Sequence, residues 1–393
     1  MNASPLPRIR LKSGGGRRFR EGHPWVFSNE LAGIPKLAPG TTVALDDAGG
    51  GFLAIGCFNP KSLISFRTLT RKEELSPSFI KERIGRASEQ RKTIIPEGEA
   101  RRVVFGESDR LPGLVIDDYG KAVSVQLLTA GMENFKEEIA SAVDELFSPD
   151  VIFFKNDSSM RELEGLPKES FLHKGASSVT STKFRGLSFE FDLALAQKTG
   201  LFLDQRENLE LVSSFDLKGK RALDLFCYYG CWGMTALHSG AREALFVDSS
   251  RRALEAAEKA LELSGLKGAD LMESDVFDYL PKLKADGEKF DIVFSDPPAF
   301  AKSAKHVREA YKAYRKLNEG CMKLLSKGGI LVASSCSYNM PRELFLESLQ
   351  EAAARSRRDV RFLFWGRQSF DHPVSLSFPE SAYLKTAFLK IIE

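Results

Sequence analysis

The stretch Arg221-Ala-Leu-Asp-Leu-Phe-Cys-Tyr-Tyr-Gly-Cys-Trp-Gly233 decides the fold of this chain. It opens with a short apolar run, Ala222 to Phe226, and a glycine-containing turn and a helix-like segment follow. This order predicts a buried parallel strand that leads into a helix. In open α/β sheets, ligands bind at the carboxyl ends of such strands. The stretch therefore predicts a ligand site at the turn, where Gly230 and Gly233 would let the backbone approach the ligand.

Strand and helix patterns alternate regularly from this stretch to the C-terminus. We expect strands at 222–226, 244–248, 269–274, 290–295 and 330–335, and helices near 232–239, 251–264, 276–283, 306–325 and 342–355. Such alternation predicts a doubly wound parallel sheet with right-handed crossovers. Two closing strands, Val360 to Trp365 and Ala382 to Ile392, have no full helix between them, which predicts an antiparallel edge.

Acidic residues mark successive strand ends of this predicted sheet. Asp248 lies at the distance from the glycine turn that is expected of a carboxylate that binds a ribose. Asp275 follows the next strand, and Asp296 opens an Asp-Pro-Pro loop after the one beyond it. The glycine pattern matches neither a dinucleotide fingerprint nor a phosphate loop. The strand ends therefore predict a pocket for a nucleoside without a pyrophosphate.

The glycine turn and the three acidic strand ends, in this order, resemble the class I S-adenosylmethionine-dependent methyltransferases. The resemblance implies S-adenosylmethionine as the cofactor. Asp248 would hold its ribose, Asp275 and Val276 its adenine, and the turn from Asp224 through Gly230 its methionine part. The cofactor-binding residues that we expect are Phe202, Gln205, Arg206, Asp224, Phe226, Tyr228, Gly230, Asp248, Ser249, Asp275, Val276 and Asp296.

The segment Gln197 to Asn208, just before the first strand, mixes cations, amides, carboxylates and aromatic rings. Arg206 or Lys198 could pair with the carboxylate of an amino acid, and Asp204 with its ammonium group. Ordinary charge pairing at the start of a helix explains the same residues. The Lys-Thr-Gly and Leu-Asp-Gln-Arg pieces of this segment also resemble the sequence that precedes the core in one group of ribosomal RNA methyltransferases.

The length and composition of the chain limit which classes of protein it can belong to. A length of 393 residues predicts two or three domains, and a formal net charge of +3 gives no basic field over the whole chain. Five cysteines without framework spacing indicate a reducing compartment. Without an apolar signal core or a long apolar run, we expect a cytoplasmic protein that does not enter a membrane. Cys227 and Cys231 lack a second ligand pair, so no metal site is expected.

Residues 8–75 predict a small β barrel, because short apolar strands alternate with glycine-rich turns. Arginines and aromatic residues between its first two strands could contact phosphates and stack on bases. A solvated basic loop over an aromatic core is the alternative. The piece His23-Pro-Trp-Val-Phe-Ser28 resembles the RNA-binding PUA domain of the same methyltransferase group. The candidate RNA-binding residues in this region are Arg17, Arg18, His23 and Trp25.

Residues 76–185 predict a middle α+β domain, and residues 186–393 the methyltransferase domain. The middle domain contains a charged helix, a hairpin from Leu114 to Leu128, a helix near Glu133 to Phe147 and a strand from Val151 to Lys155. Residues 158–183 are polar and weakly periodic, and we interpret them as a linker or an exposed flap.

Two motifs concern the methyl acceptor. The loop Asp296-Pro-Pro-Ala-Phe300 is similar to loops of enzymes that methylate exocyclic nitrogens, where the carboxylate accepts amine hydrogens and the aromatic ring stacks the base. Pro297 and Phe300 would then contact a flipped base. Cys336 ends a buried strand beside the same rim. A thiolate that adds to carbon 6 of cytosine makes carbon 5 nucleophilic, whereas many cysteines at strand ends are only packed.

One feature departs from the usual pattern of RNA 5-methylcytosine enzymes. Many carry a cysteine after the two prolines, and this chain has Ala299 there. Either another base removes the carbon 5 proton or Cys336 is not a nucleophile. His372, in Asp371-His-Pro-Val374, is a candidate proton acceptor, although such a residue more often packs an interface.

Nearly the whole chain resembles the ribosomal RNA large-subunit methyltransferase I group. The resemblance implies methylation of carbon 5 of a cytosine in large-subunit ribosomal RNA, with Cys336 as the attacking group and Asp296 orienting the base. Methylation of an exocyclic base nitrogen and a non-catalytic RNA-binding assembly factor are the alternatives. The oligomeric state is open, and a homodimer is one option.

Overall fold

The computed structural model describes residues 5–301 and 303–393. Contacts between residues divide the chain into two compact units. Unit 1 contains the residues up to Lys183 together with Phe191–Leu203 and Phe370–Ser381, and unit 2 contains Phe184–Glu190, Asp204–Ser369 and Ala382–Glu393. The three-domain division expected from the sequence stays a prediction.

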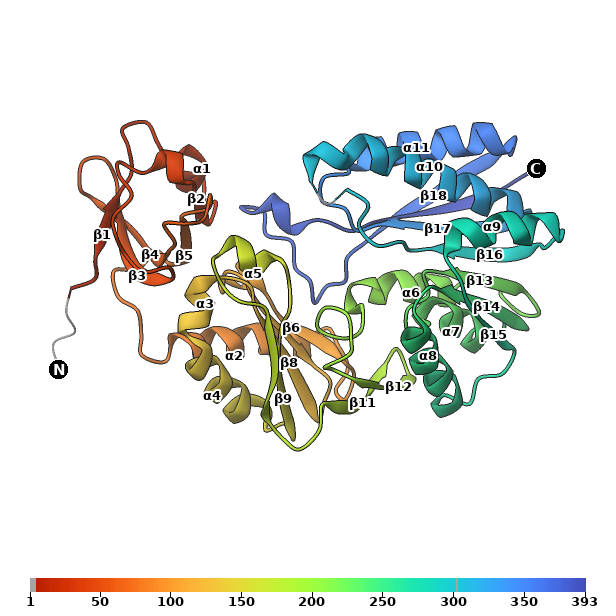
Figure 1. The fold of residues 1–393 in the computed structure, drawn as a ribbon, viewed down its shortest axis with the longest axis horizontal. Coiled ribbons are helices and arrows are strands. Elements are labelled where there is room, and N and C mark those ends of the chain that lie inside the picture. The colour runs from red at the N-terminus through yellow and green to blue at the C-terminus, as the bar shows by residue number, and fades with distance from the viewer. Residues whose placement is uncertain (1–4, 302) are drawn as a thin grey trace. The chain divides into compact units, whose positions relative to one another are not determined.

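Unit 1 begins with a small β barrel (Figure 1). Its five strands run in the order β1-β3-β4-β5-β2. Their bounds are β1 Arg8–Arg10, β2 Trp25–Val26, β3 Thr41–Asp46, β4 Phe52–Phe58 and β5 Phe66–Thr70, with α1 Arg17–Arg20 and η1 Ser28–Glu30 between them. Apolar side chains of these elements, among them Leu11, Phe19, Phe58 and Phe66, form one buried core. The predicted barrel is confirmed by this sheet and core.

A second five-stranded sheet in unit 1 has the order β10-β9-β8-β7-β6. The bounds are α2 Phe79–Lys92, β6 Arg101–Phe105, η2 Gly106–Asp109, β7 Leu114–Asp118, β8 Ala122–Leu127, α3 Ala130–Asn134, α4 Lys136–Phe147, β9 Val151–Asn156, α5 Met160–Leu163 and β10 Glu169–Lys174. Two further strands, β11 Val179–Phe184 and β12 Leu187–Asp192, form a separate two-stranded sheet. Helices α2 and α4 bury Ile84, Ile139 and Val143 against the sheet. The predicted hairpin is β7 and β8, which pair antiparallel.

The predicted linker at 158–183 is wrong. Residues 169–174 form β10, which pairs antiparallel with β9 with Ser170 opposite Lys155, and residues 179–184 form β11. The six residues of β10 have no buried side chain. Because β10 is an edge strand held by backbone hydrogen bonds, it gives no alternation of apolar and polar residues for sequence analysis to detect.

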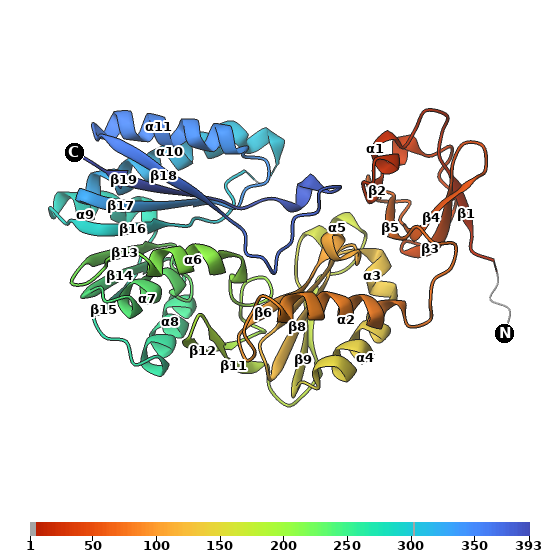
Figure 2. The ribbon, with the colours of Figure 1, turned by 180° about the vertical axis from the view of Figure 1, so that it is seen from behind.

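Unit 2 is built around a seven-stranded sheet with the order β15-β14-β13-β16-β17-β19-β18 (Figure 2). The strands are β13 Arg221–Leu225, β14 Glu243–Asp248, β15 Ala269–Glu273, β16 Phe290–Ser295, β17 Leu325–Ser335, β18 Val360–Arg367 and β19 Lys385–Ile391. The first five are parallel, and β19 runs antiparallel to both β17 and β18. The predicted doubly wound sheet with an antiparallel edge is confirmed.

Helices cover both faces of this sheet, with α6 Arg206–Ser213, α7 Cys231–His238 and α8 Arg251–Leu263 on one face and α9 Val276–Ala285, α10 Val307–Leu324 and α11 Arg342–Ser356 on the other (Figure 1). The shorter elements are η3 Leu203–Gln205, η4 Ala304–His306 and η5 Pro379–Ser381. Leu223, Val293 and Leu331 of the central strands are fully buried. Their apolar side chains fix the strands in register, and the register sets the positions of the strand ends.

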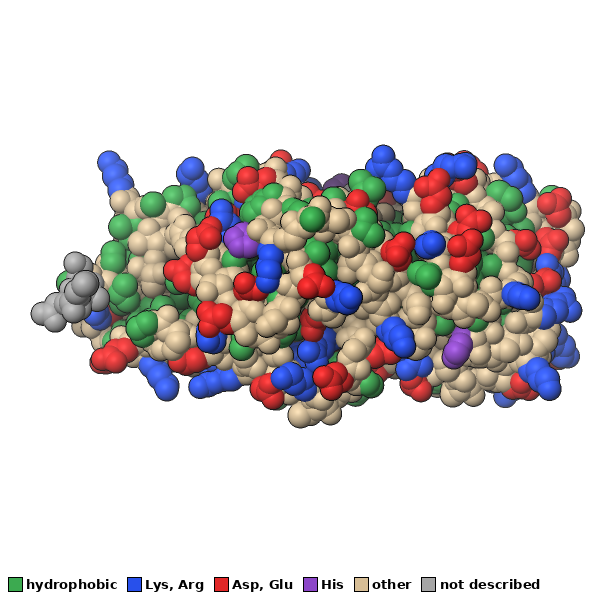
Figure 3. All heavy atoms as spheres, turned by 90° about the horizontal axis from the view of Figure 1, so that it is seen from below, with side chains coloured by type: hydrophobic (Ala, Val, Ile, Leu, Met, Phe, Trp, Pro, Cys, Tyr) green, Lys and Arg blue, Asp and Glu red, His purple; other side chains and the backbone are tan. Residues whose placement is uncertain are grey.

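Over the described ranges, no helix has both the length and the apolar composition needed to cross a membrane. On the face drawn in Figure 3, Lys and Arg side chains lie interspersed with Asp and Glu. A surface for a polyanion therefore has to come from a local cluster and not from a broad field on this face.

Candidate active site

The predicted strand ends meet at one edge of the unit 2 sheet. Leu225 of β13 lies opposite Val247 of β14 on one side and Ser295 of β16 on the other. Ser295 in turn lies opposite Ala333 of β17. This register places Asp248, Phe226, Asp296 and the end of β17 in neighbouring positions. The sheet therefore brings the predicted cofactor residues and the predicted thiol to a common rim.

The loop after β13 has a strained backbone. Phe226 and Tyr228 adopt left-handed conformations with φ of 60° and 52°, which non-glycine residues rarely adopt. Two hydrogen bonds tie this loop to the next strand: Asp248 Oδ2 accepts from the Tyr228 amide at 2.9 Å, and its Oδ1 accepts from the Ser250 amide at 2.8 Å. Strain of this kind persists only where surrounding contacts enforce it, and it is concentrated at functional sites.

The two glycines of this loop have a packing role that the sequence did not indicate. A Cβ atom on Gly233 would lie 2.3 Å from Cε1 of Phe246, and one on Gly230 would lie 3.0 Å from the same atom. Gly230 also has a φ of 79° at the start of α7. Both glycines therefore let α7 pack closely on β14. Close approach of their backbone to a ligand stays a prediction.

Asp224 offers a buried carboxylate to a ligand. Its side chain is completely buried, and its Oδ2 accepts a hydrogen bond from the Gly233 amide at 2.8 Å. Its Oδ1 has no hydrogen-bond partner among the described residues. Burial raises the pKa of Asp224 well above its usual range, and the charges of Asp296 and Asp248 raise it further. Asp224, Asp248 and Asp296 together make this region negatively charged. An oxygen of Asp224 without a hydrogen-bond partner therefore fits a cationic ligand, such as one with an ammonium or sulfonium group.

Asp296 is held by a network that reaches back to the start of α6. Its Oδ2 accepts from Trp232 Nε1 at 3.1 Å and from Gln205 Nε2 at 3.0 Å. Asn208 Nδ2 donates to Gln205 Oε1 at 2.6 Å. Trp232, which also stacks on Phe294, and Asn208 were not predicted. Gln205, predicted to bind the cofactor, contacts the Asp-Pro-Pro loop directly.

Cys336 lies against that same loop. Its thiol is partly exposed, and Sγ lies 3.9 Å from the carbonyl oxygen of Pro297. The hydroxyl of Tyr314 bonds to the hydroxyls of Ser335 and Ser337, the two neighbours of Cys336. Burial raises the pKa of Tyr314 to about 12, so this hydroxyl is un-ionised at neutral pH. These bonds hold the residues on both sides of Cys336, which is itself only partly buried.

Lys385 is a further residue beside Cys336 that sequence analysis missed. It opens β19 opposite Ser335, and its ammonium group donates to the carbonyl oxygen of Ser337 at 2.7 Å. Burial lowers its pKa from 10.5 to about 8, and the charge of Cys336 opposes that shift. The only signal in the sequence is its place in the Pro-Glu-x-x-Tyr-Leu-Lys piece near the C-terminus.

The other cysteines of unit 2 are poorly suited to nucleophilic chemistry. Cys227 is buried, and burial, together with the nearby Asp224, raises the pKa of both Cys227 and Cys231. Cys321 is buried in the core, and burial raises its pKa to about 12. Among the described residues, no group of three or more His, Cys, Asp or Glu could hold a metal ion.

Several predicted cofactor residues have structural contacts of their own. Asp275 is exposed and caps α9 by accepting from the Phe277 amide at 2.7 Å, while Val276 is buried in the core. Ser249 is exposed beside Asp248. Asp275 and Ser249 can therefore be reached by a ligand at the ends of β14 and β15, whereas Val276 provides an apolar wall.

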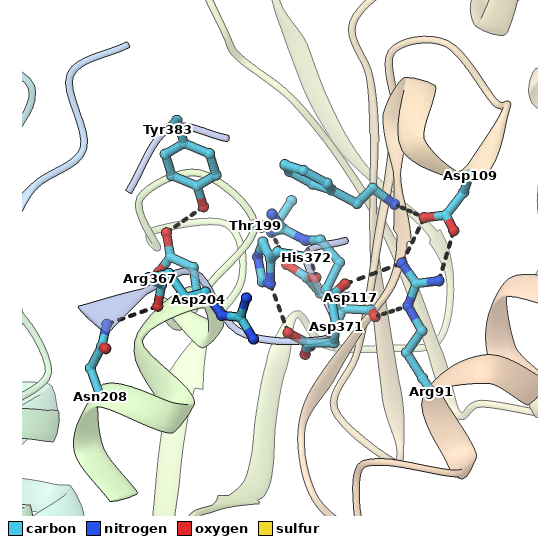
Figure 4. Close-up of polar contacts among 12 residues, drawn as sticks. Arg91, Asp109, Asp117, Thr199, Asp204, Asn208, Arg367, Asp371, His372 and Tyr383 are labelled. Atoms are coloured by element: carbon cyan, nitrogen blue, oxygen red, sulfur yellow. Dashed lines mark hydrogen bonds and ion pairs between the residues drawn. The ribbon is translucent and has the colours of Figure 1, made fainter. Parts of the chain in front are cut away.

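The segment before the sheet is divided between the two units. Phe202 belongs to unit 1, where the ammonium group of Lys198 lies 4.8 Å from its ring. Arg206 belongs to unit 2, is buried, and lies 4.7 Å from the ring of Phe184. The carboxylate of Asp204 accepts from the Tyr383 hydroxyl (Figure 4). The expected pairing of Asp204 and Arg206 with an amino-acid ligand stays a prediction.

The two residues predicted to contact the flipped base, Pro297 and Phe300, differ in exposure. Pro297 is buried, and Phe300 is partly buried with its ring 4.8 Å from that of Tyr314. Phe300 also packs near the ring of Phe277 at 6.0 Å. A base that stacks on Phe300 would have to use the exposed part of a ring that already belongs to the core, and this role stays a prediction.

The four RNA-binding candidates of the barrel also differ. Arg17 is exposed and pairs with Glu21, and Arg18 pairs with Glu380. His23 is only 3% exposed, and its Nε2 lies 3.2 Å from Glu380. Trp25 donates through Nε1 to Glu107 at 2.8 Å. The rings of His23 and Trp25 are thus part of the packing of unit 1, and RNA contact by the four residues stays a prediction.

His372 lies in unit 1 and is buried. Its Nδ1 lies 2.7 Å from the Asp371 carboxylate, whose other oxygen accepts from the Arg102 amide at 2.9 Å. Arg91 bonds to the Asp371 carbonyl oxygen and forms a two-bond pair with Asp109 (Figure 4). This network ties the segment around His372 to the rest of unit 1, which favours a packing role over proton transfer.

The fold and the site define a class I methyltransferase that uses S-adenosylmethionine. Comparison with protein families agrees: the S-adenosylmethionine-dependent methyltransferase family matches residues 154–366, and the PUA-like domain matches residues 9–71. A Klebsiella pneumoniae protein named ribosomal RNA large subunit methyltransferase I is 35% identical, with 98% of each chain covered. A Shewanella denitrificans protein of the same name is also 35% identical, over 96% of this chain and 98% of its own. The chain belongs to the ribosomal RNA large-subunit methyltransferase I family.

Solved structures confirm the fold. A protein of Streptococcus mutans assigned to the S-adenosylmethionine-dependent methyltransferases aligns with a TM-score of 0.82 at 22% identity, with 98% of this chain and 100% of that one covered. A methyltransferase structure in complex with SAH aligns with a TM-score of 0.83 at 22% identity and the same coverage. The cofactor that the resemblance implied, S-adenosylmethionine, is confirmed by the match to the S-adenosylmethionine-dependent methyltransferase family.

Proposed function

We propose that this enzyme transfers a methyl group from S-adenosylmethionine to carbon 5 of a cytosine in large-subunit ribosomal RNA. The names of the relatives and the PUA-like domain support ribosomal RNA as the substrate. The observation that carries the choice of carbon 5 is the partly exposed thiol of Cys336, 3.9 Å from Pro297 of the Asp-Pro-Pro loop and next to Lys385. A cytoplasmic location accompanies this proposal.

The cofactor would be held by the ends of β13, β14 and β15. Asp248 presents a carboxylate fixed by two backbone amides, and it would accept the ribose hydroxyls. Asp275 and Val276 would flank the adenine, and the buried oxygen of Asp224 that has no hydrogen-bond partner would face the cationic methionine part. Bound in this way, S-adenosylmethionine supplies a methyl group that is electrophilic because it is carried on a sulfonium sulfur.

Lys385 would activate the thiol. An ammonium group next to a cysteine favours the thiolate, since opposite charges stabilise each other in a partly buried site. With a pKa of about 8, Lys385 is mostly protonated at neutral pH. The thiol proton of Cys336 would pass to solvent water, and the resulting thiolate would be paired with Lys385. In this role Lys385 acts through Cys336 and is a positioning residue.

The covalent steps then follow from the chemistry of cytosine. The Cys336 thiolate would form a bond to carbon 6, and the ring electrons would move to carbon 5. Carbon 5 would then take the methyl group while the bond from that methyl to the sulfonium sulfur breaks and leaves its electron pair on a neutral thioether sulfur. The carbon 5 proton passes to solvent water, the bond between sulfur and carbon 6 breaks, and the thiolate leaves with the electron pair. Asp296, oriented by Trp232 and Gln205, would accept hydrogen bonds from the cytosine amino group and hold the ring in place.

Methylation of an exocyclic nitrogen is the second candidate, and the Asp-Pro-Pro-Ala-Phe loop is the observation that favours it. In that reaction Asp296 would act on the amine directly, and Cys336 and Lys385 would be dispensable. The thiol beside the loop has no role there. We therefore place this reaction second.

Analysis of the product separates the two reactions. Large-subunit ribosomal RNA prepared without this modification is incubated with the enzyme and S-adenosylmethionine, digested to nucleosides and separated by liquid chromatography with mass detection. We expect 5-methylcytidine from the wild type and none from Cys336→Ala. A product methylated on an exocyclic nitrogen, or 5-methylcytidine at an undiminished rate from Cys336→Ala, would refute the proposed chemistry.

A further inference from the structure

Unit 1 contains two neighbouring cavities that none of the predicted site residues explains. One has a volume of about 220 Å³ and is lined by the end of β5 including Arg71, by η2, and by Ser375, Ser377 and Phe378. The other has a volume of about 310 Å³ and is lined by Arg83 and Arg86 of α2 and by η2. Ser108 and Arg110 line both cavities. The two cavities therefore share one wall. We call them together the arginine cleft, after the four arginines that line them: Arg71, Arg83, Arg86 and Arg110.

Four arginines line this cleft. Among the described residues, no ion pair joins Arg71, Arg83, Arg86 or Arg110 to a carboxylate within 4.0 Å. Arg71 donates to the Phe19 carbonyl oxygen at 2.7 Å, and Arg83 lies 5.2 Å from the ring of Phe79. These contacts orient the side chains without neutralising them.

The carboxylates in the cleft wall are already occupied by other cations. Glu107 accepts from Arg67 at 3.0 Å and from Trp25 Nε1 at 2.8 Å. Asp109 is paired with the buried guanidinium group of Arg91 through bonds of 2.7 and 2.6 Å. The charge of Glu82 on α2 partly offsets the charges of Arg83 and Arg86, but neither Glu107 nor Asp109 in the cleft wall forms an ion pair with any of the four arginines.

Arg110 lines both cavities, and its backbone adopts an unfavourable conformation. Its φ is 60°, in the left-handed region, and it ends η2 with its side chain exposed. Burial, and after it the charge of Arg110, lowers the pKa of both Arg71 and Arg83. The hydroxyl of Ser108, in the shared wall, is buried with no hydrogen-bond partner among the described residues. Repulsion among the guanidinium groups would be relieved by an anion between them.

We propose that the arginine cleft binds consecutive phosphate groups of the RNA backbone and so anchors the substrate to unit 1. Guanidinium groups match phosphate oxygens in two-bond geometry, and contacts to phosphates position an RNA without reading its sequence. Arg71 comes from the barrel, Arg83 and Arg86 from α2, and Arg110 from η2, so the charges are spread along the cleft as a chain of phosphates requires. This inference rests on the proposed function only in taking RNA as the polyanion.

The test is the salt dependence of RNA binding by a triple variant, Arg83→Gln/Arg86→Gln/Arg110→Gln. Arg71 is left in place because it also bonds to backbone carbonyl groups. The affinity for a fluorescein-labelled transcript of large-subunit ribosomal RNA is measured by anisotropy from 50 to 300 mM KCl. We expect at least about tenfold weaker binding near 150 mM KCl, and a plot of log affinity against log salt that is shallower by roughly 2, as expected for three lost phosphate contacts.

The matched control removes the same charge from unit 2 through Arg252→Gln/Arg357→Gln/Arg361→Gln, three exposed arginines. It should bind the transcript within about twofold of the wild type. Both variants should keep the wild-type melting temperature and the wild-type affinity for S-adenosylmethionine, which together exclude misfolding.

Three results would overturn the proposal: a cleft variant with the affinity and salt slope of the wild type, equal losses in the cleft and control variants, or a wild type that does not bind the transcript. Stabilisation of the wild type alone by 10 mM inorganic phosphate, with unchanged RNA affinity, would assign the cleft to a small anion instead. Binding is also measured with Cys336→Ala, which should retain full affinity. A negative binding result for the cleft variants therefore does not affect the conclusion from the product analysis. A product other than 5-methylcytidine likewise does not affect the conclusion from RNA binding.

Discussion

Replacing Lys385 with methionine should make the enzyme more stable at neutral pH and less active. The side chains have similar length, but methionine carries no charge into the partly buried position beside Cys336. Burial lowers the pKa of Lys385 from 10.5 to about 8, so the unfolded chain binds more protons than the folded chain between these two values. The wild type therefore gains stability as the pH rises through this window, and the variant lacks that gain.

The magnitude follows from the two pKa values. Applied in full, the shift makes the stability of the wild type relative to the variant rise by about 2.5 kcal/mol between pH 7 and pH 10. Because the group is only partly buried, solvent screening reduces this to about 1 kcal/mol. The variant also loses the hydrogen bond to Ser337, but that loss applies at both pH values. The pH-dependent difference therefore isolates the charge.

The stability measurement is urea unfolding of both proteins at pH 7 and pH 10, followed by tryptophan fluorescence. The functional measurement is the rate at which iodoacetamide alkylates Cys336, read from its peptide by mass spectrometry with Cys336→Ala as the blank. Loss of the ammonium group should slow alkylation and methyl transfer at pH 7 by about 10- to 100-fold. This account of Lys385 would be refuted if the free energy of unfolding changed equally in both proteins between pH 7 and pH 10. It would also be refuted if alkylation and methyl transfer were unchanged in the variant.

Three further substitutions test other parts of the site. Gly233→Ala places a Cβ atom 2.3 Å from a core ring and should lower the free energy of unfolding by about 1–3 kcal/mol, whereas Gly33→Ala, with nothing within 4 Å, should be near neutral in the same urea titration. Asp248→Asn should weaken S-adenosylmethionine binding by about tenfold in calorimetry, since a charge-assisted hydrogen bond is lost; unchanged affinity would remove Asp248 from the cofactor site. Trp232→Phe keeps an aromatic ring, although a smaller one, and removes the hydrogen bond to Asp296, so kcat should fall about tenfold with an unchanged KM for S-adenosylmethionine. An unchanged kcat would show that Asp296 needs no such support.

The alternation of strands and helices along unit 2 could be predicted because each buried strand is a continuous apolar run and each crossover has a helical period. The antiparallel edge followed from the missing helix between the last two strands. Local motifs therefore indicated the ends of β13, β14 and β16 correctly. The edge strand β10 was missed because its side chains are mostly exposed, and an exposed strand leaves no apolar alternation.

Contacts between distant residues could not be predicted in this way. Lys385 reaches Cys336 only because β19 returns antiparallel beside β17, which no local pattern of one sequence specifies. The bond between Gln205 and Asp296 joins residues 91 positions apart. The packing role of Gly233 was missed for the same reason, since the ring that requires a glycine there belongs to the neighbouring strand. Sequence spacing identified the strand ends, and tertiary packing decided what surrounds them.

Trapping of a covalent RNA adduct on Cys336 tests the central claim most directly. An RNA substrate with 5-fluorocytidine in place of cytidine is incubated with the enzyme and S-adenosylmethionine, because fluorine at carbon 5 cannot leave as a proton and the thioether is retained. We predict a stable complex in which the peptide containing residue 336 carries the methylated nucleotide, and no complex with Cys336→Ala. Full methyl transfer by Cys336→Ala, or an adduct on another residue, would contradict the account.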